Sequence, residues 1–174
     1  MNIVFYISAI VAVVATVMVI TRLNAVHALL YLIVSLLSVA VIFFVLGAPF
    51  VAALEVIVYA GAIMVLFVFV IMMLNLGPQA VEGERAVLRP SGWIGPTILA
   101  LILTGELVYY VLRGGGHGLM GTTMVGPKEV GITLLGPYLL GVELASMLLL
   151  AGLVAAYHLG RREAKGELEK REDV

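Results

Sequence analysis

Cysteine is absent from this 174-residue chain, and charged residues make up only 12% of it. Without cysteine the chain has no disulfide, thiolate nucleophile, iron–sulfur cluster or cysteine zinc site. Its three histidines lie far apart in sequence, which predicts no metal site. The net charge of −1 and the lack of a basic patch predict no nucleic-acid partner. An ordinary soluble domain carries about 25% charged residues, so the composition also excludes a soluble enzyme.

Long apolar runs take the place of the missing charge. Hydrophobic residues make up 63% of the chain, and a membrane-spanning helix needs roughly 20 apolar residues in succession. The first run lacks the positive region of a signal peptide and is predicted to be a retained helix. The pattern predicts an all-α, polytopic membrane protein of about five transmembrane helices, at residues 2–21, 26–46, 50–76, 93–112 and 137–159. These helices form a transmembrane domain over residues 1–159, and a charged tail covers residues 160–174.

The distribution of Lys and Arg predicts how the chain crosses the membrane. Five spans place the N-terminus and the loops after the second and fourth helices on one side, which carries only Arg113 and Lys128. The other eight Lys and Arg residues lie on the opposite side. By the positive-inside rule the C-terminal tail is cytoplasmic and the N-terminus is outside. The outer connection, residues 113–136, is rich in glycine and is predicted to be a flexible or hairpin-forming loop.

Three glutamates interrupt the apolar spans, and each such acid costs at least a few kcal/mol unless it is paired or hydrated. Glu55 is the strongest functional candidate, because Tyr59 follows it at i+4 and is expected to share its helix face. The alternative for Glu55 is an interfacial residue that contacts lipid headgroups or anchors a neighbour. Glu143 suits a proton path or a hydrogen bond to a partner helix equally well. Glu106 lies close to Arg113 and is expected to be an interfacial residue paired with it.

The third helix, residues 50–76, is longer than a perpendicular span needs. Directly after Tyr59 come the small residues Ala60, Gly61 and Ala62, which allow another helix to come close. Glycine in mid-helix also tolerates a kink or a π-bulge, and such bulges are frequent at functional sites. No active site or substrate cavity is evident in the chain, which favours a subunit of a larger assembly. At the start of the second helix, His27 is expected to face cytoplasmic headgroups.

The stretch from residue 54 to residue 74, LEVIVYAGAIMVLFVFVIMML, resembles the signature of one family. That family is the J subunit of bacterial NADH:quinone oxidoreductase (respiratory complex I), the counterpart of mitochondrial NADH dehydrogenase subunit 6. The resemblance covers residues 1–76 well, and the later helices agree in kind and placement. It implies that Glu55 and Tyr59 match polar positions of the family's third helix. It also implies a π-bulge in that helix, at Gly61, Ala62, Ile63, Met64 and Val65.

The resemblance further implies a function in the inner (plasma) membrane of a bacterium. The chain would be a core membrane-arm subunit that helps couple quinone reduction to proton translocation through a hydrated path at its third helix. It would bind no cofactor and carry no redox chemistry itself, while other subunits would use NADH, FMN, iron–sulfur clusters and quinone. The expected partners are the K subunit, the quinone-site subunit, the A subunit, the antiporter-like subunits and the lipid bilayer.

The candidate proton path comprises Glu55, Tyr59 and Glu143, although no motif of the family reaches Glu143. Two alternatives stay open for the function. One is a membrane subunit of a related hydrogenase or of a multisubunit cation/proton antiporter, since these assemblies share ancestry with complex I. The other is a stand-alone small transporter, which an internal repeat would favour. No such repeat is apparent in the sequence.

Overall fold

The structure is a computed structural model that describes residues 3–74, 90–112 and 124–160. Within these ranges the chain forms helices and turns and contains no strand. Helices are expected of a chain in lipid, because each helix satisfies its own backbone hydrogen bonds where no water is present. Among the described residues, five helices are long and apolar enough to cross a membrane, at Ile3–Thr21, Ala25–Val45, Pro49–Met73, Gly92–Leu112 and Leu139–Gly160. The predicted all-α architecture with five spans is confirmed.

The first two spans are single α-helices, and the third has a composite structure. They are α1 at Ile3–Thr21 and α2 at Ala25–Val45. The third span begins as α3, continues as a π-helical segment labelled η1 and ends as α4, at Pro49–Leu54, Glu55–Ile63 and Met64–Leu74. A π-helical segment in this span is consistent with the π-bulge expected there. Residues 75 and 76 of the predicted helix lie outside the described residues.

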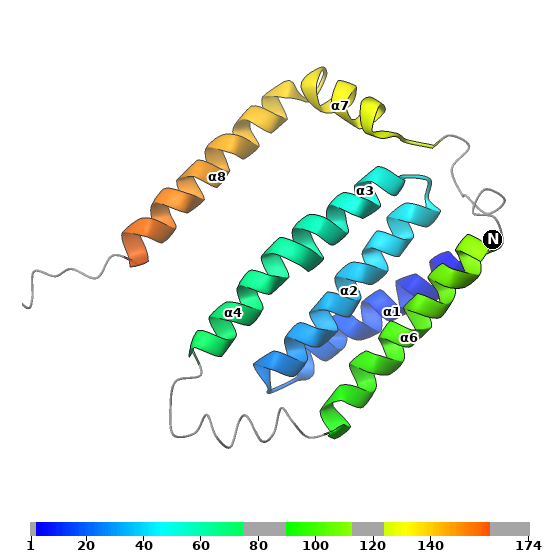
Figure 1. Ribbon diagram of the computed structural model, residues 1–174. Helices are drawn as coiled ribbons and strands as arrows, with labels where there is room; N and C mark the ends of the chain where they lie inside the picture. The colour runs from blue at the N-terminus through cyan, green and yellow to red at the C-terminus, as the bar shows by residue number, and fades with distance from the viewer. Residues whose placement is uncertain (1–2, 75–89, 113–123, 161–174) are drawn as a thin grey trace, which may run out of the picture. The chain divides into compact units, whose positions relative to one another are not determined.

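The chain divides into two compact units, Met1–Gly126 and Pro127–Val174. In the first unit, α2 occupies the centre: it contacts α1, all three segments of the third span, and α6, the fourth span at Pro90–Leu112 (Figure 1). Helix α1 also contacts α6. The buried core of this unit lies where α1, α2 and α6 meet, and its clusters comprise Val11, Ala15, Val34 and Leu103, and Val4, Val45 and Tyr110.

A tight turn at Gly47 joins α2 to the third span. Gly47 has φ 90°, a left-handed conformation that glycine adopts without steric cost. The backbone N–H of Ala48 donates to the carbonyl of Phe43 at 3.0 Å, and that of Gly47 donates to Phe44 at 3.2 Å. This pair of bonds is the Schellman pattern that ends many helices. Pro49 then opens α3 at a position where its missing N–H is not needed. The turn therefore directs the third span back along α2.

The second unit consists of α7 at Pro127–Leu135 and α8 at Leu139–Gly160. The prediction of a loop throughout residues 113–136 is wrong for its second half, because Pro127–Leu135 forms a helix. Pro127 at the first helical position and Glu129 in the first turn both favour a helix start there. The glycine-rich first half of that connection and the charged tail, residues 161–174, lie outside the described residues.

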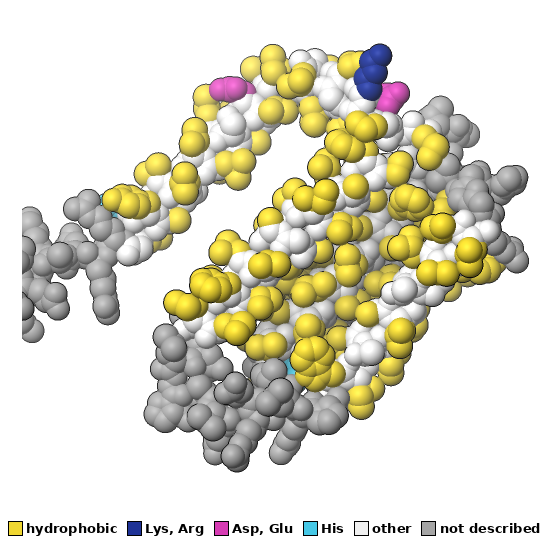
Figure 2. Space-filling view, in the orientation of Figure 1, with side chains coloured by type: hydrophobic (Ala, Val, Ile, Leu, Met, Phe, Trp, Pro, Cys, Tyr) yellow, Lys and Arg dark blue, Asp and Glu magenta, His cyan; other side chains and the backbone are white. Residues whose placement is uncertain are grey.

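Apolar side chains cover most of the surface that the structure describes. Figure 2 shows hydrophobic side chains along α3, α4 and α6, and charged side chains are few on this face. In the second unit no residue of α8 is buried. A soluble monomer rarely exposes contiguous apolar patches of this extent. Lipid or other membrane subunits therefore have to cover these helices.

Candidate functional site

The π segment η1 sets the register of the third span against α2. Ala52, before η1, and Met64, after it, are both buried, and α3, η1 and α4 all contact α2. In an unbroken α-helix of 3.6 residues per turn, two residues twelve apart would differ by about 120° around the axis. A π-helix pairs residues i and i+5 and so rotates less per residue. The π segment thus allows Ala52 on one side of it and Met64 on the other to face the same helix, α2.

Three residues of η1 are partly buried, namely Glu55, Ala60 and Gly61. Their spacing of five and six residues fits the wider π turn. Tyr59, which was expected to share the face of Glu55, is instead 49% exposed. Among the described residues no hydrogen bond joins Glu55 to Tyr59. Glu55 therefore shares the partly buried side of the span with the small residues Ala60 and Gly61.

Gly61 lies in η1 at a position where an added side chain would be tightly restricted. A Cβ atom at Gly61 would lie 3.2 Å from the carbonyl oxygen of Val56. Val56 is five residues earlier, and in a π-helix the carbonyl of residue i accepts the hydrogen bond of residue i+5. The other four residues of the expected bulge region are divided between η1 and α4. Ala62 and Ile63 are exposed residues of η1, whereas Met64, only 1% exposed, and Val65 already belong to α4.

A second intramembrane acid, Glu106, is held by a serine of a distant helix. The Oγ of Ser8 donates to Oε2 of Glu106 at 3.0 Å, and Ser8 is fully buried. The other oxygen, Oε1, is buried and has no hydrogen-bond partner among the described residues. The sequence predicts that Glu106 pairs with Arg113, but Arg113 lies outside the described residues. Sequence reasoning missed Ser8, because a single serine in an apolar run gives no signal of a partner 98 residues away.

The third acid, Glu143, lies on α8 in the second unit. Glu143 is exposed when the second unit is considered by itself. The hydroxyl of Ser146, three residues further along α8, donates to the backbone carbonyl of Glu143 at 2.8 Å and not to its carboxyl. The hydroxyl of Ser146 is therefore used within the helix. Glu143 stays a prediction from the sequence as a member of a proton path.

At the end where α1 finishes, polar contacts join the chain to α2, and α6 packs closely against α2. Arg22 donates to the Tyr31 hydroxyl at 3.5 Å, and its guanidinium lies 5.5 Å from the centre of the Tyr31 ring. His27 was expected to face headgroups, but it is partly buried. A Cβ atom at Gly92 of α6 would overlap the imidazole of His27, and one at Gly95 would overlap the Tyr31 hydroxyl. Two glycines thus make room for two side chains of α2.

The described residues contain no group of three or more His, Cys, Asp or Glu side chains that could hold a metal ion. Their polar groups are a few isolated acids and hydroxyls on otherwise apolar helices. Such an arrangement can hold protons or water and can fix helices against one another. These isolated acids and hydroxyls are therefore suited to proton transfer and to the packing of helices against one another.

Comparison with known proteins identifies the family. A family model described as NADH-ubiquinone/plastoquinone oxidoreductase chain 6 matches residues 15–159. The chain is 64% identical over 165 residues to NADH-quinone oxidoreductase subunit J of Pseudomonas aeruginosa, covering 95% of this chain and 99% of that protein. It is 59% identical over 174 residues to the protein of the same name from Escherichia coli K12, covering 99% of this chain and 94% of that relative. The chain belongs to the family of NADH-ubiquinone/plastoquinone oxidoreductase chain 6, and with its five apolar helices it is a multi-pass protein of the bacterial inner membrane.

Proposed function

We propose that this chain is a membrane subunit of a proton-pumping NADH:quinone oxidoreductase, and that η1 couples quinone reduction to proton translocation. The first part rests on the family, because relatives that match nearly the whole chain are named subunit J of NADH-quinone oxidoreductase. The chain is thus a subunit of an enzyme complex, and the other subunits of that complex are its partners. Among these, we propose the K subunit, the quinone-site subunit, the A subunit and the antiporter-like subunits as its neighbours.

Within the complex, this chain has a coupling role and does not carry the redox reaction. NADH, FMN, iron–sulfur clusters and quinone are used by other subunits. Three features of this chain support that division: the absence of cysteine, the scarcity of polar groups in the spans, and a π segment in the third span. A redox subunit needs ligands for its cofactors, whereas a coupling subunit needs an element with two stable arrangements.

The observation that carries the coupling role is the π segment beside Glu55. A π segment is rare in helices and is frequent at functional sites. Conversion of η1 to regular α-helix would rotate α3 relative to α4, because the two forms turn by different angles per residue. Glu55 and Tyr59 would then move relative to α2 and to the neighbouring subunits. Quinone reduction in a neighbouring subunit biases this equilibrium, so a hydrated path that includes Glu55, Tyr59 and Glu143 opens and closes.

Substitution of Gly61 by valine tests this role. The added Cβ would lie 3.2 Å from the Val56 carbonyl, and crowding of this kind costs about 1–3 kcal/mol. That cost falls on the π form and shifts the equilibrium towards the regular helix by roughly 5–150-fold. We expect a several-fold loss of proton pumping and of NADH:quinone turnover, while NADH oxidation by an artificial acceptor is unchanged. Dye quenching in membrane vesicles measures pumping, and NADH absorbance measures both oxidation rates.

Gly152→Val on α8 is the matched control, since a Cβ at Gly152 meets no atom within 4 Å in its own unit. A native gel stained for NADH dehydrogenase activity reports assembly of each variant. Full pumping by assembled Gly61→Val complex would exclude the coupling role of η1. Migration of the unmodified chain away from every NADH-active band would instead exclude the assignment to this enzyme, so the two parts of the proposal fail separately.

A further inference from the structure

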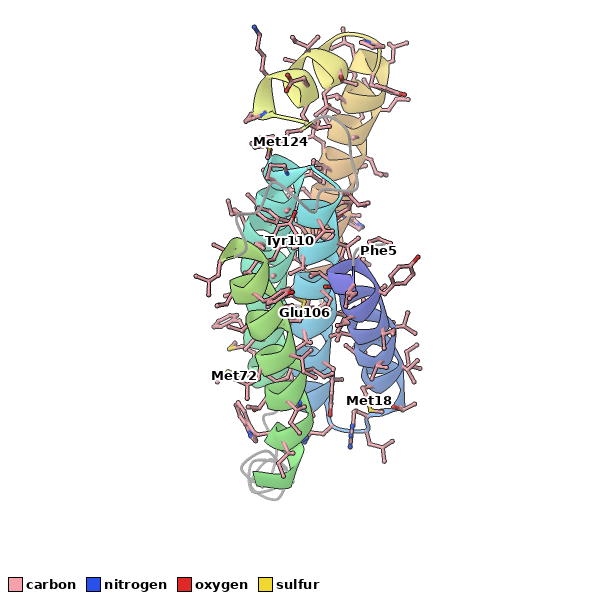
Figure 3. All side chains as sticks on the ribbon, turned by 90° about the vertical axis from the view of Figure 1, so that its right-hand side faces the viewer. Phe5, Met18, Met72, Glu106, Tyr110 and Met124 are labelled. Carbon is pink, nitrogen blue, oxygen red and sulfur yellow. The ribbon has the colours of Figure 1, made fainter. Side chains whose placement is uncertain are left out.

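The Ser8–Glu106 pair lies at the contact between α1 and α6, away from the third span. The residues around the pair are apolar. On one side lies the cluster of Val4, Val45 and Tyr110, with Phe5 and Phe44 packed against it. Figure 3 shows Glu106 and Tyr110 on the same side of α6, with Phe5 on the adjacent α1. On the other side lies the cluster formed by Val11, Ala15, Val34 and Leu103.

The two oxygens of the Glu106 carboxyl have different surroundings. Oε2 accepts the hydrogen bond of the buried Ser8 hydroxyl at 3.0 Å. Oε1 is buried and meets no donor among the described residues. An ionised carboxylate shares its charge between both oxygens, and each of them then needs a donor or water. A carboxylic acid with its proton on Oε1 carries no charge there, so a buried Oε1 without a partner costs less free energy than in the ionised form, and Oε2 remains the acceptor for Ser8.

No cation of the described first unit lies close enough to stabilise an ionised Glu106. The basic side chains of that unit in the described ranges are Arg22 and His27, both at the opposite end of the bundle. Arg22 is fourteen residues after Ser8 on α1, a separation of roughly 21 Å along the helix. His27 lies beside Gly92, which is fourteen residues before Glu106 on α6, again roughly 21 Å away.

The other titratable groups on the packed helices do not supply a counter-charge either. Tyr110, one turn beyond Glu106, packs its ring edge-on against Phe44 at 5.8 Å between centroids. Tyr6 on α1 is exposed and packs against Phe5, and Tyr31 on α2 contacts Arg22 at the far end. Tyr109 on α6 is exposed. A phenol side chain is never a cation, so none of these groups can pair with an ionised carboxylate as its counter-charge. The surroundings of Glu106 are therefore apolar or neutral throughout the described part of the first unit.

We infer that Glu106 and Ser8 form a proton-holding site in which Glu106 carries its own proton at neutral pH and Ser8 holds the neutral acid against α1. One carboxyl and one hydroxyl supply too few ligands for a metal cation, which takes six or more oxygens in the case of calcium. A bare proton needs one oxygen only. The neutral acid also avoids the cost in free energy of an unpaired ionised carboxylate in an apolar interior. This inference is independent of the coupling role of η1.

Infrared spectroscopy of the intact complex in lipid at neutral pH tests the site. A protonated carboxyl has a carbonyl stretching band that an ionised carboxylate lacks. We expect the difference spectrum between wild type and Glu106→Gln to contain this carbonyl band, with the small shift in deuterated water that an exchangeable proton causes. Gln has nearly the shape of the neutral acid, so we expect the variant complex to assemble as wild type does on a native gel.

Ser8→Ala gives a second, independent measurement. Loss of the hydrogen bond to Oε2 is expected to move the carbonyl band to higher frequency without removing it. Thr16→Val is the matched control, because Thr16 is a hydroxyl residue two turns further along α1 that bonds Ser35 at 2.9 Å and not Glu106. The control is expected to leave the band in place. If Glu106→Gln does not assemble, the shift in Ser8→Ala alone decides the matter.

Two results would overturn the inference. One is a difference spectrum for Glu106→Gln that contains carboxylate bands and no carbonyl band, as an ion pair with Arg113 would produce. The other is a Ser8→Ala complex whose spectrum in the carbonyl region is the same as that of wild type.

Discussion

At the residue scale, two glycines of α6 decide how closely that helix approaches α2. The positions that a Cβ would take at Gly92 and Gly95 are occupied by the imidazole of His27 and the hydroxyl of Tyr31. Tyr31 is only 4% exposed, so its ring cannot move aside freely. Small residues serve this purpose in membranes, where helices associate through close packing instead of a hydrophobic driving force. A single methyl group at either position is therefore expected to disturb the close approach of α6 to α2.

Gly95→Ala is predicted to weaken the contact between α2 and α6. The new methyl group would overlap Tyr31, and overpacking of this kind costs about 1–3 kcal/mol. It would also displace the Tyr31 hydroxyl from Arg22. The measurement is the fraction of the chain that stays with the NADH-active complex on a native gel after mild heating. Gly105→Ala on the same helix is the control, since its Cβ meets no atom within 4 Å. Equal retention of the two variants would contradict the prediction.

At the scale of single elements, the ends and the interruption of a helix follow from a few residues. Asn24 caps α2: its side chain accepts from the backbone N–H groups of Val26 and His27 at 3.0 and 3.3 Å. Gly47 ends the same helix in a left-handed turn. These signals are local and readable in the sequence. The π segment differs, because its presence depends on which residues of the third span have to face α2.

Asn24→Ala is predicted to destabilise the first turn of α2. Loss of an N-cap costs about 1 kcal/mol, which corresponds to roughly fivefold faster exchange of the amides that the cap protects. Hydrogen exchange of the intact complex, followed by mass spectrometry of the peptide that contains Val26 and His27, measures this change. Asn24→Asp keeps a capping oxygen and is expected to exchange at the wild-type rate. Wild-type exchange in the alanine variant would show that the cap contributes nothing.

At the scale of the whole molecule, the five spans and the uneven distribution of Lys and Arg predict the orientation of the chain across the membrane. An odd number of spans places the two termini on opposite sides. Arg22 follows α1 and a cluster of Lys and Arg follows α8, and both positions belong to the same side in a five-span chain. The positive-inside rule predicts that this side is cytoplasmic.

The predicted orientation can be checked with reporter fusions. A green fluorescent protein at the C-terminus is expected to fluoresce, and an alkaline phosphatase there is expected to be inactive, because the former folds in the cytoplasm and the latter outside it. Replacement of the tail residues Arg161, Arg162 and Lys165 by Gln is expected to weaken this preference. An active C-terminal phosphatase on the unmodified chain would contradict the orientation.

Much of the candidate site was predictable because its signals are local. Glu55 is an acid in an apolar run, and Gly61 follows it within two turns, so both were identified from the sequence. Ser8 was not identified, since its role depends on Glu106 and the two meet only when α1 packs against α6. The exposure of Tyr59 was also missed. Spacing at i+4 indicates a shared face in an α-helix, but the third span is π-helical at that point.

The sequence by itself determined the number of spans and the family, because hydropathy and the residues of the third helix are properties of continuous stretches of chain. The tertiary structure decided which residues face one another: Glu106 with Ser8, and Gly95 with Tyr31. In an apolar bundle nearly every face of a helix is hydrophobic, so periodicity does not show which face is buried. Packing between helices makes that choice, and it depends on contacts between residues far apart in the chain.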